Sequence, residues 1–186
     1  MSLINLSGQT ALITGGAKRV GRVIASSLAA RGVNILAHYN TSRAEAESLS
    51  ADLDRRGVGA WSLQASLEDP DQIETMWRRA LDCAPRGRIS LLVNNASIFP
   101  EDTLNSLSSE SLEKNLGIHA LAPLRLIRLF AAQKQPGCVV NLLDSRIGGY
   151  MKRHVSYALS KRMLFDLTRM LALELAPRVR VNSLPI

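Results

Sequence analysis

Short apolar runs alternate with longer amphipathic stretches along the whole chain. The apolar runs predict β-strands near residues 10–14, 33–39, 59–65, 89–94, 137–143 and 178–182. The stretches between them repeat apolar residues at helical spacing and predict helices near 20–31, 42–56, 71–83, 106–133 and 154–175. Pro123 could break the fourth of these helices. Regular alternation of strand and helix predicts an α/β protein with one doubly wound parallel sheet and helices on both faces.

No repeat, low-complexity tract or linker divides the sequence, so residues 1–186 are predicted to form a single domain. In open parallel sheets, ligands bind beyond the carboxyl ends of the strands. We therefore expect the functional site in the loops that follow residues 14, 39, 65, 94, 143 and 182.

Composition narrows the class of protein. The chain is 46% hydrophobic, enough for a sizeable core, and it has no apolar stretch long enough to span a membrane. Its start lacks the pattern of a signal peptide, and Cys83 and Cys138 form neither a disulfide framework nor a metal-binding cluster. These features predict a cytoplasmic protein without a metal. The net charge of +7 suits an anionic ligand or a solvated basic surface, whereas the few aromatic residues argue against nucleic-acid binding.

The first apolar run leads directly into a glycine-bearing turn and then a helical pattern. Gly15 permits the turn, and Gly21 lets the following helix pack close to the sheet. The free N–H groups at a helix start can bind a phosphate. This is the pattern of a dinucleotide-binding, Rossmann-like unit, although a glycine turn alone also occurs in ordinary α/β proteins.

The second strand ends without the acidic residue that would bind the adenosine ribose of NADH. Its end reads His38-Tyr39-Asn40, and Lys18 and Arg43 are available to a 2′-phosphate instead. The sequence therefore favours NADPH as cofactor. The alternative is that both cations are surface charges at helix starts.

Tyr157 and Lys161 lie four residues apart and share one helix face. A neighbouring ammonium lowers the pKa of a phenol, which brings it closer to the range where proton transfer is efficient. Asp144 lies thirteen residues earlier, at the end of an apolar run. By itself, the Tyr-x-x-x-Lys spacing is also common on solvated helices.

The motifs in their order resemble the short-chain dehydrogenase/reductase family. They are Thr14-Gly15 through Gly21, Asn94-Asn95-Ala96-Ser97, Asp144, Tyr157-x-x-x-Lys161 and Arg180-Val181-Asn182. Within the family, the sequence is most similar to pteridine reductases and dihydromonapterin reductases. Four features carry that similarity: Arg19 at a usual glycine, His38-Tyr39, Ser97 with Phe99 following, and Asp144 at a usual serine.

The resemblance implies hydride transfer from NADPH to a C=N bond of a pterin. Tyr157 with Asp144 would supply the proton, Lys161 would hold the nicotinamide ribose, and Phe99 would stack on the pterin. The catalytic residues implied are Asp144, Tyr157 and Lys161. The cofactor-binding residues are Gly15, Lys18, Arg19, Val20, Gly21, His38, Tyr39, Asn40, Arg43, Ser66, Asn95, Ala96, Tyr157 and Lys161. The substrate-binding residues are Arg19, Ser97, Phe99, Asp144 and Tyr157.

Three alternatives remain open at these positions. Phe99 could be loop packing, and Asp144 could be a cap. Ser145 could be the family's serine displaced by one residue, which would favour an ordinary ketone reductase. The remaining possibility is a truncated, non-catalytic module that binds a nucleotide or a partner.

The sequence departs from the family at several points. His119 stands where an asparagine usually helps to hold a water relay, and Asn115 lies one turn earlier. His119 could relay protons or simply be packed. Ser66 replaces an acidic residue that usually contacts adenine. After Arg180-Val181-Asn182 the sequence lacks the usual substrate-covering helix and last strand, and we expect that it omits part of a longer protein.

Two of the predicted helices are apolar around much of their surface, which is typical of buried helices. They are 106–133 and 154–175, and in the family they form the main subunit interface. The resemblance therefore predicts a homo-oligomer, either a dimer or a tetramer.

Overall fold

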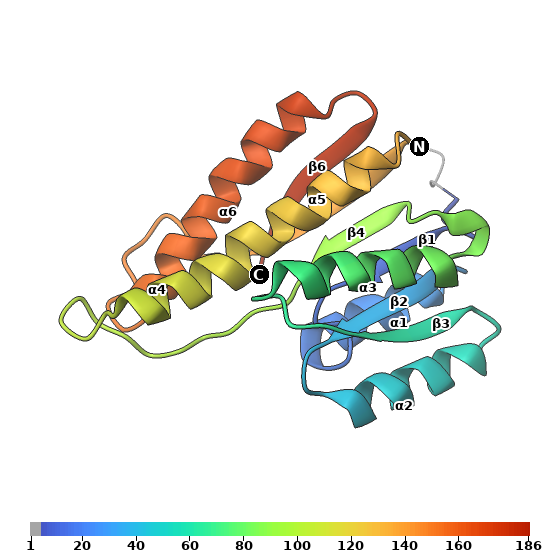
Figure 1. Ribbon diagram of the computed structural model, residues 1–186, viewed down its shortest axis with the longest axis horizontal. Helices are drawn as coiled ribbons and strands as arrows, with labels where there is room; N and C mark the ends of the chain where they lie inside the picture. Colours follow the sequence, from blue (N-terminus) through green and yellow to red (C-terminus); the bar gives the residue numbers. More distant parts are fainter. Residues whose placement is uncertain (1–4) are drawn as a thin grey trace.

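A computed structural model describes residues 5–186 and contains one six-stranded sheet flanked by helices (Figure 1). The strands are β1 (Thr10–Ile13), β2 (Asn34–Tyr39), β3 (Ala60–Gln64), β4 (Leu91–Asn94), β5 (Gly137–Leu143) and β6 (Val179–Pro185). The α-helices are α1 (Arg19–Ala29), α2 (Arg43–Asp54), α3 (Pro70–Cys83), α4 (Ser109–Leu116), α5 (Ala122–Ala132) and α6 (Val155–Glu174). A 3₁₀ turn, η1 (Pro85–Gly87), and a π-helical segment, η2 (Gly117–Leu121), complete the elements.

All strand pairs are parallel, and the strand order is β3-β2-β1-β4-β5-β6. The predicted doubly wound α/β fold is confirmed. The chain builds outward from β1 to β3 and then returns to add β4 on the other side of β1. The loops after β1 and β4 therefore lie side by side, and such a reversal point is where open sheets bind ligands.

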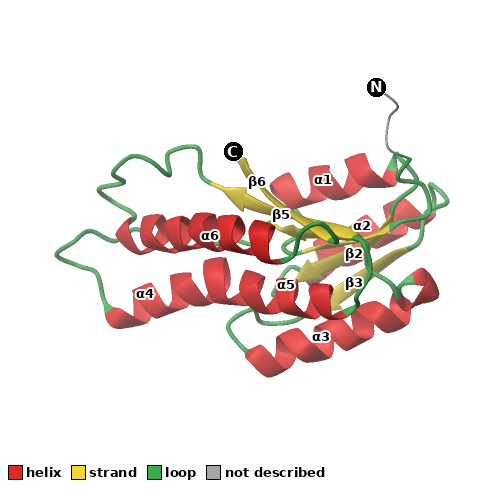
Figure 2. Cartoon of the chain, turned by 90° about the horizontal axis from the view of Figure 1, so that it is seen from above, coloured by secondary structure: helices red, strands yellow, loops and turns green. Residues whose placement is uncertain are grey.

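Two apolar clusters hold helices on opposite faces of the sheet (Figure 2). One cluster packs α1 and α2 against the side that carries Ile13 and Ile35. The other packs α3, α5 and α6 against the side that carries Leu12 and Leu92. Central strands buried on both faces explain why the sequence shows continuous apolar runs there.

The helix predicted over 106–133 begins at Ser109 and passes through Pro123 without a break. Its irregular part is η2, where the Ala122 amide bonds to the Gly117 carbonyl, five residues back. Pro123 has no amide hydrogen to donate, and the widened turn before it accommodates that loss. Of the predicted strands, the last differs most, since β6 continues to Pro185 beside the whole of β5.

Candidate active site

The loop between β1 and α1 closes tightly because two of its glycines have no side chain. Gly15 has a φ of 62°, and a Cβ there would lie 3.0 Å from the Cα of Ala96. A Cβ on Gly21 would lie 2.1 Å from the carbonyl oxygen of Gly15. Both glycines are therefore required by the backbone, as the sequence predicted. Arg19 also has a positive φ, 51°, where most residues are strained.

Side chains that follow β1 and β4 tie this loop to the neighbouring one. The Thr14 hydroxyl accepts hydrogen bonds from the amides of Asn95 and Ala96, at 2.9 and 3.0 Å. The Asn95 side chain donates to the carbonyls of Thr14 and Gly15, at 2.8 and 3.1 Å. Asn95 and Ala96 thus shape the site in addition to lining it.

His38 is buried beneath the loop at the end of β2. Its Nδ1 accepts a hydrogen bond from the Gly15 amide at 3.1 Å, and Nε2 lies 3.1 Å from the Ala65 carbonyl. A carbonyl only accepts, so the proton is on Nε2. Burial lowers the pKa of His38 to about 4, against a smaller opposing effect of the Ala65 bond. His38 therefore joins β1, β2 and β3 as a neutral ring.

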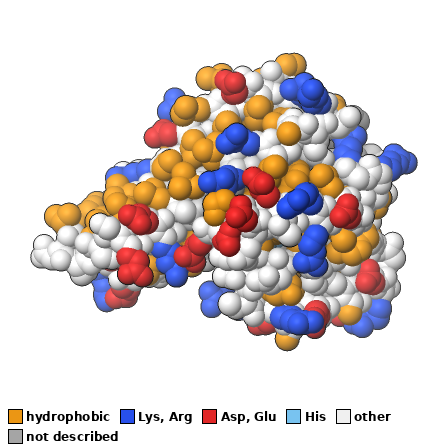
Figure 3. Space-filling model, in the orientation of Figure 1, with side chains coloured by type: hydrophobic (Ala, Val, Ile, Leu, Met, Phe, Trp, Pro, Cys, Tyr) orange, Lys and Arg blue, Asp and Glu red, His pale blue; other side chains and the backbone are white. Residues whose placement is uncertain are grey.

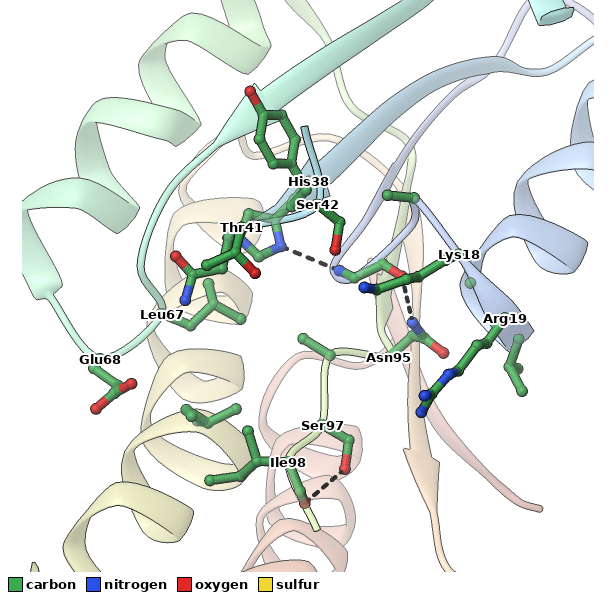
Figure 4. A pocket seen from close by; sticks show the side chains of 18 of the residues that line it. Lys18, Arg19, His38, Thr41, Ser42, Leu67, Glu68, Asn95, Ser97 and Ile98 are labelled. Atoms are coloured by element: carbon green, nitrogen blue, oxygen red, sulfur yellow. Dashed lines mark hydrogen bonds between the residues drawn. The ribbon is translucent and has the colours of Figure 1, made fainter. Parts of the chain in front are cut away.

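A cavity of about 430 Å³ opens beside these loops (Figure 4). Predicted cofactor-binding residues line it, as does the predicted substrate-binding Ser97. They are Gly15, Lys18, Arg19, Val20, Gly21, His38, Tyr39, Asn40, Asn95 and Ala96. Residues that the sequence did not single out complete the wall: Ala17, Thr41, Ser42, Leu67, Glu68, Ile98, Ile118 and Ile186.

Four predicted cofactor contacts do not line the cavity: Arg43, Ser66, Tyr157 and Lys161. The Arg43 side chain is exposed and pairs with Glu47 at 2.7 Å, one turn along α2. The Ser66 hydroxyl accepts from the Glu68 amide, within its own loop. The cations at the cavity are Lys18, which lies 3.7 Å from Glu45, and Arg19.

The predicted catalytic residues meet beyond the end of β5. The Tyr157 hydroxyl donates to Asp144 Oδ2 at 3.1 Å, and Lys161 Nζ donates to the Leu142 carbonyl at 2.8 Å. Lys161 Nζ lies 5.7 Å from the centre of the Tyr157 ring. Ser145 is exposed, so Asp144, and not a displaced serine, is the partner of Tyr157.

The carboxylate of Asp144 is stabilised in its charged form. Burial alone would raise the pKa of Asp144, but hydrogen bonds from the Arg146 backbone and side chain and from Tyr157 outweigh it and lower the pKa. The Arg146 amide donates to Asp144 Oδ1 at 2.8 Å. Arg146 was not recognised in the sequence. An arginine two residues after the carboxylate was the available signal.

Tyr157 differs from the expectation drawn from the Tyr-x-x-x-Lys spacing. Burial, followed by the charge and hydrogen bond of Asp144, raises the pKa of Tyr157, so the phenol keeps its proton. The predicted lowering by Lys161 is not found in this state of the protein. Burial instead lowers the pKa of Lys161 to about 8, while Asp144 opposes that shift.

An aromatic cluster lies next to Tyr157. The Phe99 ring is half exposed and stacks on His154, with centroids 3.7 Å apart and planes at 19°. It meets Tyr157 edge-on at 4.7 Å and 87°. Phe99 therefore packs against His154 and also presents exposed apolar surface beside the Tyr157 ring.

The loop that carries Phe99 is held by Asp102, which the sequence did not reveal. Asp102 accepts from the Ser156 amide at 3.1 Å, from the Ser156 hydroxyl and from the Ser111 hydroxyl at 2.9 Å. Ser156 lies in the first turn of α6, whose own N-cap His154 provides no side-chain bond. A carboxylate from a distant loop thus caps the helix that carries Tyr157 and Lys161.

Asn115 and His119 are both buried beside α6. Asn115 donates to Ser156 at 2.9 Å. His119 contacts Ser97, Ile98 and Ser160.

Within residues 5–186, no group of three or more His, Cys, Asp or Glu side chains could hold a metal ion. The same part of the chain contains no helix with the length and apolarity to cross a membrane.

Comparisons with known proteins find reductases that are similar to this chain over nearly its whole length. The FolM alternative dihydrofolate reductase 1 of Brucella canis, solved with NADP, is 34% identical with a TM-score of 0.91, over 98% of this chain and 74% of that one. Pteridine reductase 1 of Leishmania tarentolae is 34% identical, over 93% of this chain and 74% of its own length.

A second kind of relative is similar over a comparable length. The 3-oxoacyl-(acyl-carrier-protein) reductase FabG of Staphylococcus aureus is 27% identical, over 94% of this chain and 72% of its own. The model of the short chain dehydrogenase family matches residues 9–185. The protein therefore belongs to the short chain dehydrogenase family.

Proposed function

We propose that this protein is an NADPH-dependent reductase of a pterin-type C=N bond. The observation that carries the proposal is the hydrogen bond of Tyr157 to Asp144, a carboxylate where the family usually has a hydroxyl. Phe99 lies directly beside this pair. The pteridine and dihydrofolate reductases among the similar proteins support the same substrate class.

The residues around the cavity fit a dinucleotide. Gly15 and Gly21 leave room where a side chain would enter the loop, and the start of α1 offers free amides to a pyrophosphate. Lys18 supplies positive charge for a 2′-phosphate and Arg19 for the pyrophosphate, and no acidic residue ends β2. We therefore propose NADPH, held by the predicted residues that line the cavity, with Lys18 and not Arg43 at the 2′-phosphate. Bound NADPH would supply the hydride.

The protein's own residues would deliver the proton and stabilise the negative charge that is left behind. Reducing a C=N bond places a proton on nitrogen, and the Tyr157 hydroxyl still carries its proton. A substrate nitrogen beside this hydroxyl would compete with Asp144 for that proton. Lys161, close to the Tyr157 ring, would stabilise the phenolate left behind and hold the nicotinamide ribose.

Substrate recognition would depend on Phe99 and the polar groups around it. A flat heteroaromatic ring gains from offset or edge contacts with an aromatic side chain. His154 supports Phe99 by stacking on it and is itself fixed by a 2.8 Å contact from Nδ1 to the Pro100 carbonyl. We propose that Phe99, Ser97 and Arg19 contact the pterin, together with Asp144 and Tyr157.

A second candidate is reduction of a ketone or another carbonyl. The FabG relative favours it, and the protonated Tyr157 hydroxyl suits a carbonyl oxygen equally well. The non-catalytic alternative, a module that only binds a nucleotide or a partner, predicts no turnover of either substrate.

The deciding experiment follows NADPH oxidation with a dihydropterin and with a panel of ketones, in the wild type and in Asp144→Ser. Fast pterin turnover that falls in the variant supports the proposal. Ketone turnover that survives the substitution supports the carbonyl reductase. NADPH binding without any turnover of either class would support the non-catalytic module.

We also propose that the protein forms a dimer or tetramer through α4, α5 and α6. Apolar side chains gather over these helices in Figure 3, and Leu121, Met170 and Leu173 are exposed. Leu173 is 84% exposed, and an apolar patch that is exposed on a surface often marks an interaction site. A monomer by light scattering would contradict this proposal.

The free thiols Cys83 and Cys138 would suit the reducing cytoplasm that the sequence favours.

A further inference from the structure

His119 occupies the middle of η2, the π-helical segment between α4 and α5. π-Helical turns are rare and often mark functional sites. His119 is 1% exposed and directs its ring toward α6, where it meets the Tyr157 ring edge-on at 5.3 Å. The proposed proton transfer does not use this histidine, and the sequence left its role open.

The hydrogen bonds around His119 determine which ring nitrogen carries the proton. The Ile98 amide can only donate, and it points to His119 Nε2 at 3.1 Å. The proton is therefore on Nδ1, which donates to the Ser160 hydroxyl at 2.8 Å. Ser160 in turn donates to the carbonyl of Tyr157 at 2.7 Å. The series begins at the residue before Phe99 and ends at the catalytic tyrosine.

This arrangement opposes a proton relay through the ring. A proton on Nε2 would face the Ile98 N–H and break the contact. Burial, and then the charge of Lys161, lower the pKa of His119 to about 3, so the ring is neutral around pH 7. Lys161, the charged group that acts on His119, donates its own hydrogen bond to the Leu142 carbonyl and not to the ring.

The loop after β4 is thus held on both sides of Phe99. His119 holds it at Ile98, before Phe99. After Phe99, the Pro100 carbonyl contacts His154, and Asp102 binds the first turn of α6.

We propose that His119 is a positioning residue that fixes the spacing between Phe99 and Tyr157 by joining the Ile98 backbone to helix α6. Its effect on catalysis rests on the function proposed above. Its effect on the structure does not, and the two can be measured separately.

The structural test uses NMR on the wild-type protein without substrate. Nitrogen shifts should show a neutral His119 with its proton on Nδ1 near pH 7, and the Ile98 amide should exchange slowly. In His119→Asn, whose shorter side chain cannot reach both Ile98 and Ser160, the Ile98 amide should exchange at least about tenfold faster. A proton on Nε2, or unchanged exchange in the variant, would overturn the proposal.

The kinetic test compares His119→Asn and Ser160→Ala with Thr168→Ala. Thr168 is a matched control, because it is a buried hydroxyl on α6 that bonds to Asn141 and Leu164, away from the loop. We expect His119→Asn to raise KM for a dihydropterin about tenfold, equivalent to about 1.4 kcal/mol and comparable to one buried hydrogen bond. Ser160→Ala should act in the same direction, and the double variant should be less than additive. Thr168→Ala should lower Tm without raising KM.

A relay would give a different result. If His119→Asn lowered kcat, changed the shape of the pH profile and left KM unchanged, His119 would be moving protons and the proposal would be wrong. Absence of pterin turnover in the wild type would refute the proposed function instead, and the NMR result would still decide the positioning role.

Discussion

The proposed site has a cofactor end and a catalytic end, and the two are built in different ways. At the cofactor end, the β1–α1 loop depends on glycines and on backbone groups bound by Thr14, His38 and Asn95. At the catalytic end, Tyr157 depends on side chains from separate elements: Asp144 after β5 and His119 from η2. The first end is set mainly by glycines and by hydrogen bonds to backbone groups, and the second mainly by contacts between side chains.

This difference has a consequence for how each end fails. A loop that is held through its backbone fails when a single Cβ enters it. A site that is built from contacts between side chains loses function by degrees, as each supporting contact is removed. The predictions below test this contrast, from the largest effect to the smallest.

Tyr157→Phe should reduce kcat by about 10²- to 10⁴-fold, the usual contribution of a positioned proton donor. The substitution removes the hydroxyl bound to Asp144 and keeps the ring that contacts Phe99 and His119. NADPH binding, followed by fluorescence titration, should change much less than kcat, because most of the proposed cofactor contacts lie in the cavity, which Tyr157 does not line. Retained turnover would mean that another group donates the proton.

Gly21→Ala should weaken NADPH binding by about tenfold to a hundredfold, because overpacking of one methyl typically costs about 1–3 kcal/mol. The new Cβ would lie 2.1 Å from the Gly15 carbonyl oxygen. Gly117→Ala is the control, since a Cβ there meets nothing within 4 Å. Equal affinities in the two variants would show that the loop is less rigid than its geometry implies.

Asp144→Asn should lower kcat/KM for a dihydropterin about tenfold and change its pH dependence. In the free wild-type enzyme, Lys161 loses its proton around pH 8, so kcat/KM should fall above that pH. Asp144 opposes that loss, so the fall should begin at lower pH in the variant. If kcat/KM fell at the same alkaline pH in both proteins, the loss of the Lys161 proton would not be the cause of that fall.

Acid should destabilise the fold through its two buried histidines. An unfolded chain binds a proton on histidine near pH 6.5, whereas folded His38 does so only near pH 4 and His119 near pH 3. Between those values and about pH 6.5, protons favour the unfolded state, by about 1.4 kcal/mol per pH unit for each group. Urea unfolding should show stability rising from pH 4.5 to 6.5, with a smaller slope in His38→Gln. Identical slopes would show that His38 is not buried as a neutral ring.

The cofactor end was largely predictable from the sequence. Glycine requirements are local, so Gly15 and Gly21 could be assigned from spacing alone. Arg43 was the main misplacement, because a helix-start cation can face either way, and here it pairs with Glu47. Nothing in the sequence indicated that His38 would lie under the loop as a structural ring rather than at its surface.

The catalytic end could be predicted only in part. Tyr157 and Lys161 follow from helical spacing, and Asp144 from its place after a strand. The direction of the pKa shift of Tyr157 did not follow, because it depends on burial and on a carboxylate that only the fold brings to 3.1 Å. Asp102 and His119 act over 54 and 41 residues, on Ser156 and Ser160, and no local pattern signals such contacts.

The Asp102 contact limits how this enzyme could be re-engineered. A designer seeking a new substrate would first exchange the loop around Phe99, as if it were an independent cassette. That exchange would also remove the carboxylate bound to Ser111 and Ser156, and with it the cap of the helix that carries Tyr157. Grafts that keep Asp102, or that transfer Ser111 and Ser156 together with the loop, should preserve turnover where simple loop swaps lose it.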